Sequence, residues 1–256
     1  MSEAKTISDL LSYVDFLLRH REPQRALNVL TKQQSLLCDS GQAWQLRGQA
    51  HYELCEFPEA LAALEHASLL VPLLPEAQCR LAECYLRARQ RDLANVIYRH
   101  LATLEMLPEE TAPPIARGLA TSGELGMSLN FCLAQLRRFG GNHELHFVAA
   151  TVMQRLGCHS EDIYPFIFQA HHLRPDVLPY RISFAQHLVA LDRHQDAEAA
   201  LTAVDLDRVA CIASLERLRQ LFLQLGNEDA EAECHARLAQ IGYERSATWR
   251  PNSDES

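Results

Sequence analysis

Small residues recur along this chain at a fixed interval of 34 residues. Ala26, Ala60 and Ala94 are separated by that interval, and Ser128 lies one further period along the chain. The segments around them share a pattern: "EPQRALNVL" at 22–30, "EFPEALAAL" at 56–64, "QRDLANVIY" at 90–98 and "ELGMSLNFC" at 124–132. A fixed period of this length is typical of solenoids, in which each repeat packs only on its neighbours.

Each repeat is predicted to contain two helices. The segments at 10–18, 43–54 and 77–88 carry apolar residues at positions i, i+3, i+4 and i+7, and each precedes one of the recurring segments. Gly48 in one first helix would face Ala60 in the second helix, which lets the two axes approach closely. The pattern therefore predicts a series of helical hairpins.

The segment "AWQLRGQAHYELCEFPEALAALEHASLLVP" resembles a tetratricopeptide repeat (TPR). The matching residues are Trp44, Gly48, Ala60, Leu64, Ala67 and Pro72. Arg47 departs from the family pattern, which usually has an apolar residue there. The resemblance implies an all-α, TPR-type right-handed superhelical solenoid of six to seven helix-turn-helix hairpins.

The same resemblance implies how the chain is organised. We expect TPR repeats 1–3 over 7–108, a degenerate fourth repeat that acts as a hinge over 109–142, and repeats 5–7 with a C-terminal capping helix over 143–243. A disordered tail is expected over 244–256 because that segment is polar and lacks the repeat pattern.

Glycines distinguish the fourth repeat from the others. Gly118, Gly123 and Gly126 are expected to weaken its helices, and Gly140 and Gly141 are predicted to form a left-handed cap at its end. The fifth repeat fits the template when one residue is inserted in its turn, "GCHSED".

Composition limits the classes of partner. Asp and Glu total 33 against 24 Lys and Arg, so we expect neither a nucleic-acid partner nor an anionic membrane. The longest apolar stretch, 69–74, is too short to span a bilayer, and the start of the sequence is unlike a signal peptide, so a cytoplasmic protein is expected. The eight cysteines include no CxxC pair, which predicts buried free thiols.

The sequence contains no motif for catalysis or cofactor binding that we recognise, so neither an enzyme nor a cofactor is expected. One histidine-rich region raises an alternative, a zinc-binding regulatory subunit. Its residues are His143, His146, Cys158, His159, His171 and His172. No pair has the i, i+4 spacing of a helical zinc motif, which favours histidines that serve packing and surface contacts.

In TPR solenoids the first helices line a concave groove, and the resemblance implies the same here. The residues one turn apart on that face are Gln42, Gln45, Gln49, Arg80, Glu83, Arg87, Arg117 and Arg155. A groove with these side chains suits an extended peptide, particularly an acidic one. The alternative is that the face is polar only because it is solvated.

A second candidate surface lies in the fifth repeat. Tyr164 and Phe168 are four residues apart, off the face formed by Ile163 and Ile167. Exposed aromatic residues at this spacing would anchor a partner or a second copy of the chain, a homo-oligomer. The alternative is that they stack against the sixth repeat.

Together these features predict a non-catalytic scaffold or adaptor that binds a peptide or partner protein in its concave groove. A chaperone for a secreted or assembling client and the zinc-binding regulatory subunit remain as alternatives.

Overall fold

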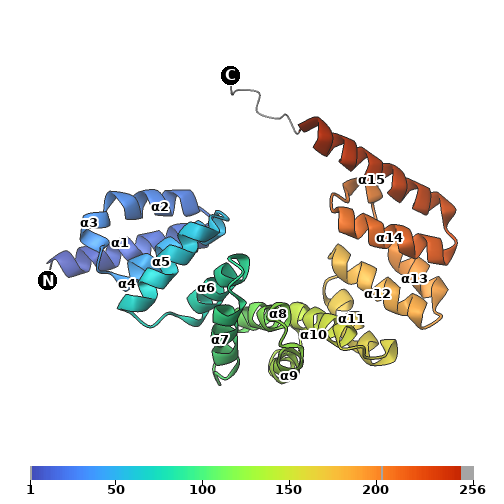
Figure 1. Cartoon of the computed structure of the whole chain (residues 1–256), viewed down its shortest axis with the longest axis horizontal. Coiled ribbons are helices and arrows are strands. Elements are labelled where there is room, and N and C mark those ends of the chain that lie inside the picture. The colour runs from blue at the N-terminus through green and yellow to red at the C-terminus, as the bar shows by residue number, and fades with distance from the viewer. Residues whose placement is uncertain (1, 203, 249–256) are drawn as a thin grey trace. The chain divides into compact units, whose positions relative to one another are not determined.

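The computed structural model describes residues 2–202 and 204–248, with side chains over 6–202 and 204–242. In these residues every regular element is a helix, and the long helices form seven consecutive hairpins (Figure 1). The predicted all-α class and repeat number are thereby confirmed. The hairpins belong to two compact units, Met1–Cys132 and Leu133–Ser256, each of which is described by itself.

The N-terminal unit contains the first three repeats and most of the fourth. Their helix pairs are α1 (Ser2–Arg19) with α2 (Pro23–Lys32), α4 (Gly41–Glu53) with α5 (Phe57–Leu70), α6 (Pro75–Arg87) with α7 (Arg91–Ala102), and α8 (Ala112–Ser122) with α9 (Leu125–Leu136). Short helical turns, α3 (Gln34–Leu37) and η1 (Glu109–Thr111), join some of the repeats. The unit boundary falls inside α9. First helices of successive repeats contact one another: α1 contacts α4, and α4 contacts α6.

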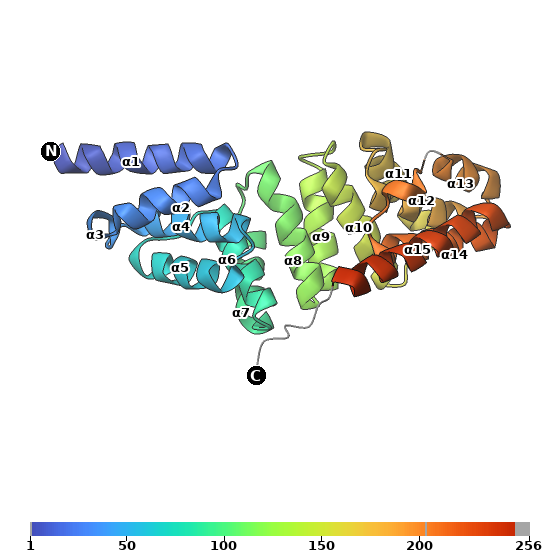
Figure 2. The same cartoon turned by 90° about the horizontal axis from the view of Figure 1, so that it is seen from above.

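The C-terminal unit contains the other three hairpins. They are α10 (His143–Arg155) with α11 (Ser160–Leu173), α12 (Leu178–Ala190) with α13 (His194–Leu201), and α14 (Ile212–Leu225) with α15 (Glu228–Thr248). The turn η2 (Leu206–Arg208) precedes the last pair. Figure 2 shows α14 and α15 side by side, and α14 also contacts α12.

One residue in the turn of each hairpin adopts a left-handed conformation. These residues are Arg21, Cys55, Arg89, Gly123, Gly157, Asp192 and Gly226. They recur every 34 residues, except that 35 residues separate Gly157 from Asp192. The second helix begins two residues after the left-handed residue in six hairpins and three residues after Gly157. The extra residue therefore lies in the turn of the fifth repeat, where the sequence predicts it.

Because a side chain disfavours the left-handed region, Arg89→Gly should raise the free energy of unfolding by about 0.5–1 kcal/mol. Gly123→Ala, at the equivalent turn of the next repeat, should lower it by about 1 kcal/mol. Urea denaturation followed by circular dichroism measures both changes. If Arg89→Gly destabilises the protein as much as Gly123→Ala does, the left-handed strain is not the controlling factor.

Small residues lie between the two helices in several hairpins, as the repeat pattern predicts. A Cβ atom placed on Gly48 of α4 would lie only 2.6 Å from Cγ of Leu64 on α5. Ala60 and Ala94 have no exposed surface. The small residue of the fourth repeat is Ser128, which is fully buried and donates a hydrogen bond to the carbonyl oxygen of Ala116, 2.8 Å away.

Gly118 has a different role from the weakening expected of it. It lies on α8 directly under the buried ring of Tyr98 on α7, and an added Cβ would be 2.2 Å from the Tyr98 Cζ atom. The absence of a side chain thus lets the third and fourth repeats pack. Gly123 supplies the left-handed turn residue of the same hairpin.

Gly118→Ala should lower the free energy of unfolding by about 1–3 kcal/mol, because the Tyr98 ring has to move. Gly126→Ala is the matched control: its Cβ would meet nothing within 4 Å, and alanine favours a helix over glycine by about 1 kcal/mol. Chemical denaturation of both variants checks the prediction. Equal effects of the two substitutions would contradict the packing role of Gly118.

Two further expectations need correction. Gly140 and Gly141 do not form a left-handed cap, since neither has a positive φ; instead the Asn142 side chain accepts a hydrogen bond from the Leu145 amide at 3.0 Å and caps α10. Helix α15 continues to Thr248, so 244–248 of the expected tail is helical, and 249–256 lies outside the described residues. The hinge over 109–142 remains a prediction.

The departure at Arg47 has a physical reason. Its guanidinium lies 4.6 Å from the centre of the Trp44 ring and donates a hydrogen bond to the Leu30 carbonyl oxygen at 3.4 Å. Leu30 is in the last turn of α2, where carbonyl groups have no partner within their own helix. Arg47 therefore joins the second repeat to the end of the first.

Candidate functional site

A groove of about 500 Å³ crosses the first helices of the N-terminal unit. Four of the predicted residues line it: Gln42, Gln45, Gln49 and Arg80. Four charged residues that were not predicted also line it: Asp15, Arg19, Glu76 and Glu110. The remaining lining residues are Leu11, Ser12, Leu46, Leu74 and Ala77.

The repeat period explains which side chains reach the groove. Gln42, Glu76 and Glu110 are spaced by 34 residues and occupy the same position in successive repeats. Leu46 and Arg80 occupy a second such position, one turn along each helix. The spacing from Gln42 is the signal by which Glu76 and Glu110 would have been found.

Some lining side chains already have partners within the protein. Gln45 accepts a hydrogen bond from the Leu74 amide at 3.2 Å, and Gln49 donates one to Glu53 at 2.9 Å. Arg19 and Asp15 form an ion pair at 2.8 Å. Among the described residues, Arg80 has neither a hydrogen-bond partner nor an ion pair, so its guanidinium is available to a ligand.

The other predicted groove residues do not line this cavity. Glu83 and Arg87 pair with each other at 2.9 Å on α6, and the Arg87 guanidinium lies 3.9 Å from the centre of the Phe57 ring. Arg117 is exposed on α8, and Arg155 is exposed on α10 of the C-terminal unit.

Tyr164 and Phe168 stack against the sixth repeat, which is the alternative to an exposed aromatic pair. Both rings pack against Phe184 of α12, at 5.9 and 6.0 Å between centres. The Tyr164 hydroxyl accepts a hydrogen bond from Arg193 at 2.9 Å. Phe168 remains 40% exposed, so its accessible area is the part of this pair that a partner would contact.

Comparison with known proteins identifies the fold. No family model and no curated protein matches the sequence. Solved structures do match: a tetratricopeptide repeat protein from Parabacteroides merdae is 10% identical with a TM-score of 0.67, over 95% of this chain and 96% of that one. The chain has the tetratricopeptide repeat fold.

Two other solved TPR structures agree. The C-terminal part of a TPR repeat-containing protein from Cytophaga hutchinsonii is 12% identical with a TM-score of 0.62, over 90% of this chain and 95% of that one. YrrB, described as a TPR protein with an unusual peptide-binding site, is 18% identical with a TM-score of 0.56, over 76% and 98% of the two chains. Identities this low establish the TPR fold alone.

The described part of this TPR array contains no helix that is both long and apolar enough to cross a membrane.

Four histidines of the fifth TPR hairpin have separate partners. The His143 Nδ1 atom hydrogen-bonds with the Tyr180 hydroxyl at 3.0 Å, and the His146 Nε2 atom with the Gly140 carbonyl at 2.9 Å. His171 stacks on Phe184, and His172 on Phe168. Nowhere in the described residues do three His, Cys, Asp or Glu side chains form a group that could hold a metal ion.

The cysteines of the TPR array are free thiols, as predicted, but they are not all buried. Cys79, Cys84, Cys132 and Cys234 are buried, whereas Cys38, Cys55 and Cys211 are exposed. Burial raises the pKa of Cys79 to about 12 and that of Cys84 to about 11. These two thiols are therefore protonated at neutral pH and are weak nucleophiles.

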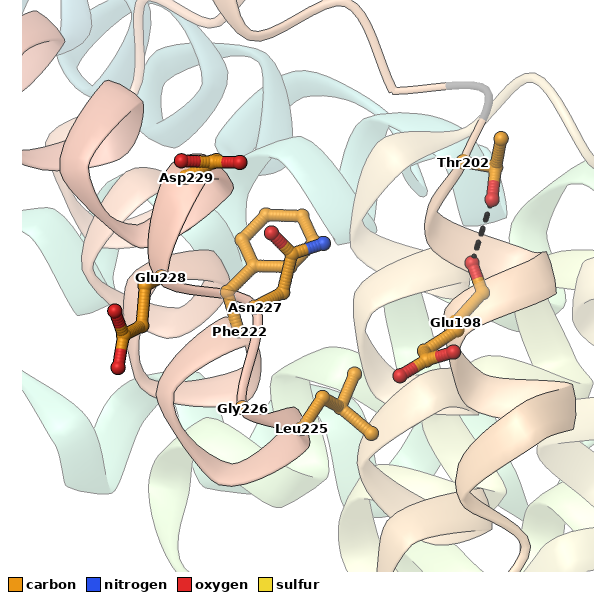
Figure 3. Close-up of a pocket in the computed structure, with 8 residues that line it drawn as sticks. All are labelled: Glu198, Thr202, Phe222, Leu225, Gly226, Asn227, Glu228 and Asp229. Carbon is orange, nitrogen blue, oxygen red and sulfur yellow. Dashed lines mark hydrogen bonds between the residues drawn. The ribbon is translucent and has the colours of Figure 1, made fainter.

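An open hollow of about 540 Å³ lies beside the turn of the last TPR hairpin (Figure 3). Its acidic residues are Glu198, Glu228 and Asp229. The other polar groups serve the helices themselves: Thr202 donates to the Glu198 backbone carbonyl at 2.9 Å, and Asn227 accepts from the Ala230 amide at 3.1 Å. Figure 3 shows the three carboxylates pointing in different directions, so they do not converge on a ligand.

Among the histidines whose side chains are described, His187 is the buried one. It lies on α12 with its Nδ1 atom 3.3 Å from the Ser160 hydroxyl oxygen, and it is 7% exposed. Burial lowers the pKa of His187 below its ordinary value. The folded protein therefore contains this imidazole in its neutral form at neutral pH.

Because the unfolded chain binds the His187 proton more tightly than the folded chain does, the free energy of unfolding should fall as pH drops below about 6.5. Above that pH the imidazole is neutral in both the folded and the unfolded chain, so it adds no further pH dependence. His187→Gln should reduce this dependence, and His194→Gln, at an exposed position, should leave it unchanged. Urea denaturation at a series of pH values from 5 to 8 measures it; identical profiles for the wild type and His187→Gln would refute the assignment.

Proposed function

We propose that this chain is a non-catalytic protein-interaction scaffold whose N-terminal unit binds an extended peptide segment in the groove across α1, α4 and α6. The observation that carries the proposal is the unpaired Arg80 guanidinium in a groove lined by side-chain amides. An extended peptide needs donors and acceptors for its backbone groups, and Gln42 supplies both. The peptide-binding site named for YrrB, a protein of the same fold, adds support by analogy.

The lining charges suggest the character of the peptide. Asp15, Glu76 and Glu110 carry negative charge, whereas Arg19 and Arg80 carry positive charge. Arg19 and Asp15 pair with each other, which leaves Arg80, Glu76 and Glu110 as the other charged side chains of the lining. This mixture favours a polar segment with charges of both signs over a uniformly acidic one.

The groove is formed by packed helices, so a peptide orders little of the host when it binds. Leu46 and Ala77 at its base are buried in the folded chain. A preformed site loses less affinity to ordering than a flexible one. The lining includes Ser12 but neither histidine nor cysteine, so it lacks the usual base that would activate a hydroxyl nucleophile. Both points favour binding without catalysis.

The test starts from peptides selected by display against the immobilised protein and measures their dissociation constants by fluorescence anisotropy. Arg80→Glu and Gln42→Glu should each weaken binding by about tenfold or more, because a charge-assisted or amide hydrogen bond is replaced by repulsion or lost. Arg91→Glu is the control: it makes the same change of charge at an exposed position of α7, a second helix. Circular dichroism confirms that each variant is folded.

Loss of binding in Arg80→Glu with retention in Arg91→Glu supports the groove. Equal affinity of all variants for every selected peptide, or a selection that yields no peptide, counts against it.

A further inference from the structure

Arg217 of the C-terminal unit occupies the position that Arg80 has in the N-terminal unit. Each lies nine residues before the left-handed turn residue of its own hairpin, Gly226 and Arg89 respectively. Each also belongs to a first helix that contacts the first helix of the preceding repeat: α14 contacts α12, and α6 contacts α4. The repeat period therefore places Arg217 on the first-helix face of its unit.

Two neutral side chains of α12 fix one end of the Arg217 guanidinium. Its Nη2 atom donates to the Ser183 hydroxyl oxygen at 2.9 Å and to the Gln186 amide oxygen. No described residue forms a hydrogen bond with its Nε or Nη1 group. Neither atom is one of the polar atoms that are both buried and without a partner. The Nε and Nη1 groups are therefore not fully buried.

The charge of Arg217 also has no counter-ion. No carboxylate of the described residues forms an ion pair with it, although Arg174, Arg193, Arg208 and Arg219 of the same unit each pair with an Asp or Glu. Partial burial lowers the pKa of Arg217, because removing water disfavours the charged form. A half-buried cation without an anion is costly for the free protein, and a ligand carboxylate would offset that cost.

We propose that Arg217, held in place by Ser183 and Gln186, is a receptor for the carboxylate of an Asp or Glu side chain in an acidic peptide segment. Nη2 already donates to Ser183 and Gln186, so the N–H groups of Nη1 and Nε remain as charged donors for a carboxylate oxygen. This inference rests on the proposed function, since it assumes that the chain binds peptide segments. It places a preference for acidic peptides in the C-terminal unit. The N-terminal groove keeps the proposed preference for peptides with charges of both signs.

The experiment compares three pools of fluorescein-labelled nonapeptides. The first is acetylated and amidated and carries three Glu residues among random neutral ones; the second replaces each Glu by Gln; the third is the Gln pool with a free C-terminal carboxylate. Anisotropy measures the affinity of the full-length protein for each pool. A second readout is the Arg217 Nε–Hε resonance in protein labelled with ¹⁵N-arginine, assigned by its loss in Arg217→Lys.

We expect the wild type to bind the Glu pool at least tenfold more tightly than the Gln pool, and we expect the Arg217 resonance to shift only with the Glu pool. Arg217→Gln should abolish that preference, and Arg217→Lys should retain part of it because it keeps the charge but loses the fixed guanidinium donors. Arg208→Gln is the matched control, since Arg208 is an exposed arginine of the same unit. The melting temperature of Arg217→Gln should equal or exceed that of the wild type, because an uncompensated charge is removed.

The proposal is overturned if the wild type does not distinguish the Glu and Gln pools, if it binds neither, or if Arg208→Gln loses as much affinity as Arg217→Gln. Tighter binding of the free-carboxylate pool than of the Glu pool would show that the site receives a chain terminus, and would also overturn it. The affinity of the display-selected peptides for Arg80→Glu tests the N-terminal groove separately. A negative result for Arg217 therefore does not change the outcome of that test.

Discussion

In the hairpins the two helices approach closely where a small residue lies between them, and the remaining features of the repeat depend on this contact. Gly48 under Leu64 is the clearest case, because an added Cβ would collide with the leucine. Helices this close leave room for only a short reversal of the chain, and one left-handed residue provides it in every hairpin. The first helices then lie next to one another, and the side chains on their free face form the binding surface.

Much of the fold could be predicted from the spacing of small residues. The interval from Ala26 to Ala94 predicted the hairpins, and the mismatch in the fifth repeat predicted its extra turn residue. The role of Gly118 could not be predicted in this way, since its neighbour Tyr98 belongs to the preceding repeat. The left-handed turns at Arg21 and Arg89 also carried no glycine signal, although the 68 residues between them equal two periods of the alanines.

The candidate site was less predictable because a polar residue on a helix can face a ligand, water or its own neighbour. Glu83 and Arg87 illustrate the last case: their i, i+4 spacing lets them pair with each other. Arg217 could not be predicted because, in the sequence, an arginine with an acidic partner and one without look the same. Only the contacts with Ser183 and Gln186 distinguish it.

Two side chains connect neighbouring repeats in the N-terminal unit more firmly than apolar stacking alone. Arg47 reaches from the second repeat to the end of α2, and the Tyr98 ring of the third repeat fills the space over Gly118 in the fourth. In a linear array, stability passes from one repeat to the next only through such interfaces. Unfolding of one hairpin therefore removes contacts from the next. We expect this unit to unfold cooperatively, with little separate unfolding of single repeats at its ends.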